Sequence, residues 1–570
     1  MKRIIALLSL VLSLGTAALV EFHTGKTLET DELIFEESGI LTDEDTFARA
    51  EIKHIVFTLE GGRETGAVST DEDVNKLLEM ARDAYSRFPD SKGILLVDDG
   101  RNTLHEDRTR NYSYRMAYLV LSEARKDIGT FRHYYKEGDN EVKIHFARLI
   151  KPDGRVIELD PASIRIESPP REDIVFFGKT KWITFTLPGV EIGDIVEYSY
   201  ENIRFNPWNK DFFSAGYFFQ GEDPYIFSRL IVDVPASEYI KWKIYNAPDG
   251  MISSSEETKG NRKIYTWISK DAPPYVTEPN SPPIGDFVPR VDVTNLESWD
   301  PLFDWYASFE EERIKVTPQI QTLVDSLTRG TETKDDTVAV IYHWLQQNIR
   351  YISIKGGAAS GVSGHPAQFT LERGFGDCSD KSILFAALLE AAGIDCDPVS
   401  LGTNDDYEML DPEMPSTYGN HAINKVFFSD TSFYLDATGG DFGGFARYPS
   451  FDAHDQGVYA VNSRKREIEI IPLRSPEHEL RHYNLDMEID TEGNLIINYQ
   501  SFYEGDYETT LRYYWNYFSR EEDRRLSFEQ MIKRTSPDAV LLDYELINVD
   551  HLSKPFSIKM SYKVPGWVKF

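Results

Sequence analysis

The chain is short of cysteine, since its 570 residues contain only two, Cys378 and Cys396. Two thiols exclude a disulfide-rich scaffold, and the sequence has no Cys-x-x-Cys pair that could hold a metal ion. It also lacks a His-Glu-x-x-His motif and a glycine-rich nucleotide loop. We therefore expect no metal site and no cofactor.

Positive charge is also scarce, with 61 Lys and Arg against 94 Asp and Glu and a formal net charge of −33. Phosphate backbones and anionic lipid surfaces repel such a chain, which argues against nucleic acid and anionic membranes as partners. The charge would favour basic or neutral substrates. Solubility explains it as well, because the acidic residues are spread along the whole chain.

Long apolar runs are missing except at the N-terminus. There Lys2 and Arg3 precede an apolar stretch over residues 4–20, which is the pattern of an export signal. Cleavage is expected near Ala17 or Ala18, with an uncleaved N-terminal anchor as the alternative. No other segment is long enough to span a membrane, so we expect a periplasmic or secreted protein with no integral span beyond the signal peptide.

Several domains are expected, because a single hydrophobic core seldom serves more than about 250–300 residues. Aromatic residues make up 13% of the chain and short strand patterns recur on both sides of a helical middle region, which favours antiparallel sheets. The chain ends inside an apolar pattern at Phe570, so the natural protein is expected to continue. The predicted parts are a signal peptide (1–20), an acidic, partly helical segment (21–90), a β-rich domain (91–271), a proline-rich linker and lead-in (272–310), a core (311–470) and a second β-rich domain (471–570).

The most distinctive motif is a glycine-rich turn, residues 374–381, that delivers Cys378 to the start of an apolar run. The run covers residues 383–392 and stops at Gly393, a residue typical of the position just past a helix end. A thiol at a helix N-terminus lies beside unpaired backbone N–H groups and the positive end of the helix dipole. Both favour the thiolate, which is the nucleophilic form.

A histidine and an aspartate follow this cysteine in the order His421, Asp436. A cysteine, a histidine and an aspartate are the components of a thiol acyl-transfer site. In such a site the aspartate orients the histidine. A simple hairpin with its turn at Asp430 would set His421 opposite residue 440, so Asp441 competes with Asp436 for this role.

Cys396 has the simpler interpretation of a small buried residue at the start of a strand. A helix between the two cysteines would span roughly 15–20 Å, too far for a disulfide, so both thiols are expected to be free. We expect Cys378 to be partly exposed.

Four neighbouring residues have structural interpretations that compete with functional ones. Asp380 is expected to stabilise the first helical turn through the helix dipole. His365 could belong to the cleft or to a surface loop, whereas Trp344 and Tyr351 are more typical of core packing. Trp344 belongs to a helix expected over residues 335–348, for which Thr331 or Thr333 is the candidate cap.

The middle of the chain resembles the transglutaminase-like superfamily, a branch of the papain-like folds. The matching pieces are residues 342–351, 365–367 and 376–381, followed by His421 and residues 435–438. The resemblance implies a catalytic Cys378, His421 and Asp436, and it favours Asp436 over Asp441. The region upstream, about residues 142–206, resembles the DUF3857 domain.

The implied fold class is α+β, with a papain/transglutaminase-like core flanked by mostly antiparallel, β-sandwich-like domains. The implied function is that of an exported thiol acyl-transfer enzyme that acts on protein or peptide amides by hydrolysis or transamidation. Two alternatives are a catalytically silent binding module and an assembly module of the cell envelope.

Overall fold

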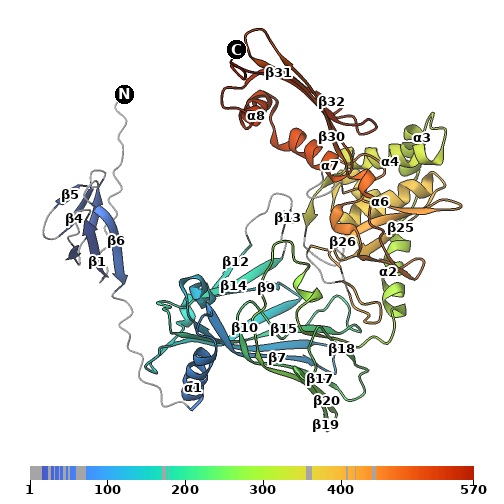
Figure 1. Cartoon of the computed structure of the whole chain (residues 1–570). Helices are drawn as coiled ribbons and strands as arrows, with labels where there is room; N and C mark the ends of the chain where they lie inside the picture. The colour runs from blue at the N-terminus through green and yellow to red at the C-terminus, as the bar shows by residue number, and fades with distance from the viewer. Residues whose placement is uncertain are drawn as a thin grey trace, which may run out of the picture.

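The structure is a computed structural model (Figure 1). It shows a large sheet, a mixed α/β region and a C-terminal sheet, which follow one another along the chain. No helix in the described part of the chain is long and apolar enough to cross a membrane. The described residues are 72–169, 179–354, 362–405, 409–417, 419–438 and 445–569, together with the strands that precede residue 60 and the pair 175–176.

Short strands occupy the region before residue 60. β1 begins inside the stretch expected to be a signal peptide and pairs with β6, while residues 1–15 lie outside the described residues. The segment over residues 21–90, expected to be partly helical, thus contains strands as well as the helix α1 (Glu72–Arg87). The strands are β1 (Thr16–Phe22), β2 (Thr27–Thr30), β3 (Leu33–Glu36), β4 (Gly39–Thr42), β5 (Thr46–Ala48) and β6 (Ile52–Leu59).

An eight-stranded sheet follows, in the order β11-β10-β15-β8-β7-β17-β20-β19. All neighbours are antiparallel except β7 and β17. α1 packs on β7 and buries Val74 and Leu77. The strands are β7 (Gly93–Leu104), β8 (Arg110–Val120), β10 (Asn140–Ile150), β11 (Val156–Glu158), β15 (Ile195–Arg204), β17 (Tyr225–Pro235), β19 (Ile252–Lys259) and β20 (Arg262–Ala272).

Two three-stranded sheets accompany the large one. The strand β21 falls in the stretch expected to be a linker, yet it is the middle strand of its sheet and buries Val291 and Val293. Its five residues are too few, and too close to prolines, to stand out as a strand in the sequence. The strands are β9 (Thr130–Lys136), β12 (Arg165–Glu167) and β14 (Thr180–Thr186) in one sheet, and β16 (Ser214–Phe218), β18 (Lys241–Tyr245) and β21 (Arg290–Thr294) in the other.

The mixed region, here called the core region, combines five helices with a five-stranded antiparallel sheet in the order β27-β26-β25-β28-β29. β13 (Val175–Phe176) joins it by pairing with β23 (Ser353–Ile354). Its elements are α2 (Asp300–Arg313), α3 (Pro318–Leu327), α4 (Lys334–Asn348), β22 (Arg350–Tyr351), α5 (Ala367–Arg373), β24 (Phe375–Gly376), α6 (Cys378–Ala391), β25 (Asp395–Leu401), β26 (His421–Phe427), β27 (Ser432–Leu435), β28 (Tyr459–Asn462) and β29 (Glu467–Ile470).

α6 is the central helix of the core region. It contacts α3, α4 and α5 as well as β25 and β26. Every residue from Cys378 to Leu389 is buried, which explains why the sequence shows a continuous apolar run instead of an amphipathic pattern. Gly393 follows with a φ of 71°, as expected for the residue after a helix end. The position of Cys378 is therefore fixed by the most buried helix of the region.

The loop that precedes β26 is contacted by β18 and by the residue before α2. Lys243 Nζ lies 2.5 Å from an Asp411 carboxylate oxygen, and the Tyr245 hydroxyl donates to the same oxygen at 2.7 Å. The indole N–H of Trp299 donates to the carbonyl of Pro412 at 2.8 Å. The loop that leads to His421 is thus fastened from two other parts of the chain.

The C-terminal region is a four-stranded antiparallel sheet, in the order β30-β31-β33-β32, with two helices. Trp515 and Phe528 stack at 4.8 Å in its core. An ion pair of 3.0 Å between Arg447 and Glu508 joins it to the core region. Its elements are β30 (Arg481–Ile489), β31 (Leu495–Tyr503), α7 (Asp506–Tyr513), α8 (Glu521–Lys533), β32 (Val540–Ile547) and β33 (Ser557–Val564).

Candidate active site

Cys378 is the first residue of α6, and two aspartates form a reciprocal cap around it. The Asp380 N–H donates to the Asp377 carboxylate at 3.1 Å, and the Asp377 N–H donates to the Asp380 carboxylate at 3.2 Å. This capping box satisfies backbone donors that the first helical turn leaves unpaired. The thiol therefore lies at the positive end of a well-terminated helix, as the sequence predicts.

Two glycines precede Cys378, and each is required by a different steric constraint. Gly374 ends α5 with a φ of 68°, a left-handed conformation that favours glycine. A Cβ at Gly376 would lie 2.4 Å from the Cβ of Asp380, which is an impossible approach. The capping aspartate thus excludes any side chain at residue 376.

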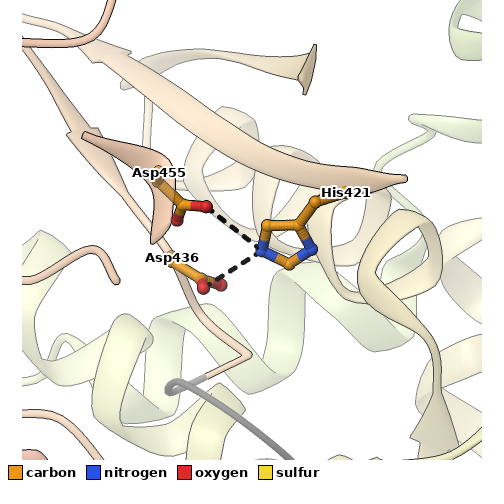
Figure 2. A group of neighbouring side chains, drawn as sticks. All are labelled: His421, Asp436 and Asp455. Carbon is orange, nitrogen blue, oxygen red and sulfur yellow. Dashed lines mark hydrogen bonds and ion pairs between the residues drawn. The ribbon is translucent and has the colours of Figure 1, made fainter. Parts of the chain in front are cut away.

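His421 and Asp436 lie next to each other, with 3.2 Å between Nε2 and Oδ2 (Figure 2). The Asp436 N–H donates to the carbonyl of Ser450 at 3.0 Å, and the Tyr342 hydroxyl donates to the carbonyl of Asp436 at 2.8 Å. Thr438 donates its N–H (2.7 Å) and hydroxyl (2.5 Å) to Oδ1 of Asp436. These bonds hold the carboxylate with Oδ2 turned to the imidazole.

Which aspartate can orient His421 depends on where the hairpin of β26 and β27 ends. Phe427 pairs with Ser432 and Asn424 with Leu435, so continuation of the ladder would set His421 opposite Thr438. The strand stops at Leu435 instead, and the chain turns Asp436 back towards the histidine. The competitor Asp441 lies outside the described residues.

Electrostatics favour a charged imidazole. Burial disfavours the charged form of His421, but the negative charges of Asp436 and Asp455 and hydrogen bonds to Asp436 and Cys378 outweigh it, and the pKa of His421 rises well above its usual value. The pKa of Asp436 is lowered, because His421 and the Thr438 donors outweigh its burial. An imidazolium next to a carboxylate and a thiol is the arrangement that stabilises a thiolate.

Cys378 is more enclosed than the sequence suggests. The residue is 3% exposed, so the expectation of a partly exposed thiol was wrong. Its thiol interacts electrostatically with His421 and with the Tyr351 hydroxyl. Burial, followed by the thiol's charge, raises the pKa of Tyr351 well above its usual value, so this hydroxyl stays protonated as a donor. Tyr351 therefore belongs to the site and not only to the packing.

Cys396 and Trp344 were expected to have structural roles. Cys396 is fully buried on β25, its sulfur 3.5 Å from the Asn424 side-chain nitrogen, and burial raises its pKa well above the usual value. Both cysteines are free, as predicted. Trp344 packs against the apolar cluster of the core region.

Asp380 has a second partner besides the cap. Its carboxylate accepts the His365 N–H at 2.6 Å and lies 2.8 Å from His365 Nδ1. This places His365 beside the start of α6. Asp380 therefore has the structural role that the sequence suggests and ties down the loop in front of Cys378 as well.

Asp455 is the site residue that the sequence analysis missed. Its Oδ1 lies 4.0 Å from Nε2 of His421, on the side of the ring that faces Asp436 (Figure 2). It comes from a short 3₁₀ turn between β27 and β28, where no periodic pattern marks it. Its side chain, His421 and Asp436 form a group of donors close enough to hold a metal ion.

Two family models match the chain. Residues 106–276 match a domain of unknown function with a solved structure, DUF3857. Residues 321–437 match the transglutaminase-like superfamily, and they include Cys378, His421 and Asp436. The chain carries a transglutaminase-like domain. The resemblance inferred from the motifs is confirmed for both regions.

Comparison with solved structures gives two likenesses of different strength. A crystal structure described as a "putative protease" from Parabacteroides distasonis ATCC 8503 is 12% identical, covers 83% of this chain and 93% of its own, and has a TM-score of 0.55. A structure described as a "putative cysteine protease" from Cytophaga hutchinsonii is 15% identical over 40% of this chain and 78% of its own, with a TM-score of only 0.19. Curated proteins give no match. The first likeness, with the sheets above, confirms the predicted α+β class.

The transglutaminase-like domain and the cysteine–histidine–aspartate geometry together support a thiol-dependent enzyme of this superfamily. In thiol acyl-transfer enzymes a thiol is the nucleophile, an imidazole exchanges its proton, and a carboxylate orients the imidazole.

Proposed function

We propose that this protein is an exported cysteine-dependent acyltransferase or peptidase that acts on amide bonds of proteins or peptides through an acyl-enzyme on Cys378. The observation that carries the proposal is the pair of a part-buried His421 and a buried Asp436 beside a thiol at a helix N-terminus. The N-terminal pattern of Lys2 and Arg3 before an apolar stretch supports export.

In the first half-reaction the Cys378 thiolate attacks the amide carbonyl carbon. The oxyanion that forms is stabilised by the backbone N–H of Cys378, at the N-terminus of α6. His421 then gives its proton to the amine, the carbon–nitrogen bond breaks, and a thioester remains on the sulfur. Nδ1 carries this proton, because Nε2 faces Asp436 (Figure 2).

In the second half-reaction water or a substrate amine attacks the thioester carbon while His421 takes a proton from it. The carbon–sulfur bond then breaks, the acyl product leaves, and the Cys378 thiolate beside the protonated His421 is restored. Water gives hydrolysis and an amine gives transamidation. The choice depends on water exclusion, for which Tyr351 and the burial of Cys378 are favourable features.

A second candidate, a catalytically silent core that serves as a binding module, is favoured by the enclosure of the thiol. A small cavity of about 20 Å³ lined by Ser379 and Ala422, neighbours of Cys378 and His421, has room for about one water molecule. A substrate would have to open this region.

The deciding experiment is labelling with a biotinylated thiol electrophile that carries a peptide, on the wild type and on Cys378→Ala. Cys396→Ala is the matched control. The enzyme interpretation requires labelling that Cys378→Ala abolishes and Cys396→Ala leaves intact. A folded wild type that is never labelled would support the binding module.

A further inference from the structure

Asp455 has an unusual environment for a carboxylate. The residue is fully buried, and neither of its carboxylate oxygens accepts a hydrogen bond from any residue that the structure describes. A buried carboxylate without donors is costly unless a cation or a proton neutralises it. Its closest cationic group, the imidazole of His421, is 4.0 Å away, beyond hydrogen-bond distance.

Both carboxylates and the imidazole converge on one small volume (Figure 2). Nε2 of His421 is 3.2 Å from Asp436 Oδ2 and 4.0 Å from Asp455 Oδ1, and all three atoms lie within 4.8 Å of one another. Tetrahedral zinc with bonds of about 2.0–2.1 Å separates its ligand atoms by about 3.4 Å. Side-chain shifts of about 1 Å would therefore bring the three atoms to zinc-binding distances.

The chemistry of the three donors also suits zinc. One imidazole nitrogen and two carboxylate oxygens are ligands that Zn²⁺ accepts. Thr438 holds the other oxygen of Asp436 with two hydrogen bonds, which fixes the ligand as outer partners do in zinc sites.

We propose that His421, Asp436 and Asp455 bind one divalent transition-metal ion, with Zn²⁺ the best match, and that the bound ion switches off the thiol. The ion takes the nitrogen of His421 that faces the carboxylates. The remaining imidazole proton then resides on Nδ1, so the ring has no lone pair left to accept the thiol proton. Cys378 stays in the thiol form, which is the unreactive one.

The binding site stands independently of the enzyme activity, whereas its inhibitory effect rests on the function proposed above. Binding is therefore measured in Cys378→Ala, which cannot react. Titration of this variant with ZnCl₂ in a calorimeter should show one site of micromolar or tighter affinity. Asp455→Asn in the same background should weaken binding at least about tenfold. Asp452→Asn, which changes a nearby carboxylate that is no ligand, should leave the affinity unchanged.

Two results would overturn the site. One is the absence of zinc binding in the folded Cys378→Ala protein, which would place any zinc on the thiol and His421 instead. The other is equal affinity with and without Asp455. If Asp455→Asn does not fold, as judged by near-ultraviolet circular dichroism, Asp436→Asn replaces it and must show the same loss.

Inhibition is tested on the wild type by the rate at which iodoacetamide alkylates Cys378. Zinc should slow this rate at least about tenfold, and EDTA should restore it. Alkylation that is unaffected by zinc at concentrations that saturate the calorimetric site would refute the switch and leave the site in place. Failure of the proposed enzyme activity would appear separately, as slow alkylation without any zinc.

Discussion

A cysteine lies near each end of α6, and the charged residues around the two cysteines have different partners. At the N-terminal end, His421 and Asp436 act on the sulfur of Cys378. Beyond the C-terminal end, the charges around Cys396 bind one another instead. Arg464 lies 3.0 Å from Asp397 and 3.0 Å from Glu390. We therefore call the first the reactive end, after the function proposed for it, and the second the cohesive end.

The largest expected effect is at the reactive end. Asp436→Asn removes the anion that orients and charges His421, so turnover should fall by about 10²–10⁴-fold while the protein stays folded. Until a substrate is found, the pH profile of Cys378 alkylation serves as the readout and should shift.

Asp441→Asn is the control for this variant. It changes the carboxylate that simple hairpin spacing favours, and it should leave rate and profile unchanged. A shift with Asp441→Asn but not with Asp436→Asn would reverse the assignment.

At the cohesive end the expected effect is on stability. Arg464→Ala leaves Asp397, 1% exposed, without its guanidinium and should lower the free energy of unfolding by about 2–4 kcal/mol. Urea unfolding measures it. Alkylation of Cys378 should not change, and a large drop in its rate would show that the two ends are coupled.

The two thiols themselves give the third contrast. Iodoacetamide should modify Cys378 at least about tenfold faster than Cys396 in the native protein, because one thiol has an imidazolium partner and the other is buried with a raised pKa. Peptide mapping by mass spectrometry over time distinguishes them. Equal and slow modification of both would remove the chemical difference between the two ends.

The smallest effect concerns pH. Burial raises the pKa of Glu310, which lies near the cohesive end and accepts a hydrogen bond from Ser463 at 2.6 Å, to about 7. The folded protein then holds a proton that the unfolded chain loses near its ordinary pKa. The stability contributed by this proton is complete below about pH 4.5 and disappears as the pH rises through about 7.

The wild type should therefore lose about 1 kcal/mol of stability between pH 6 and pH 8, and Glu310→Gln, which has no such proton to lose, should not. Urea midpoints at these two pH values measure the change. A loss of the same size in both proteins would mean that the proton is not the cause.

Local patterns carried much of the sequence interpretation. The end of α6 at Gly393, the N-cap of α4 at Thr333 and the position of Cys378 all follow from short-range chemistry that can be read from neighbouring residues. These features depend on caps and apolar runs, and such signals survive without tertiary information.

Other parts could not be foreseen, because they depend on contacts between distant residues. The burial of Cys378 comes from the surrounding chain and not from its own helix turn. Asp455 reaches His421 only because β28 returns to pair with β25. The place of β21 in a sheet is set by its partners β16 and β18, which precede it by many residues.

The position of β28 bears on where the transglutaminase-like domain can be cut. The family match ends at residue 437, but Leu401 of β25 pairs with Ala460 of β28 beyond that limit. A fragment that stops at 437 would present an open strand edge, which invites aggregation, and would lose one of the two acids beside the histidine. The shortest piece that keeps all five strands of the sheet and the complete site extends through β29 to Ile470.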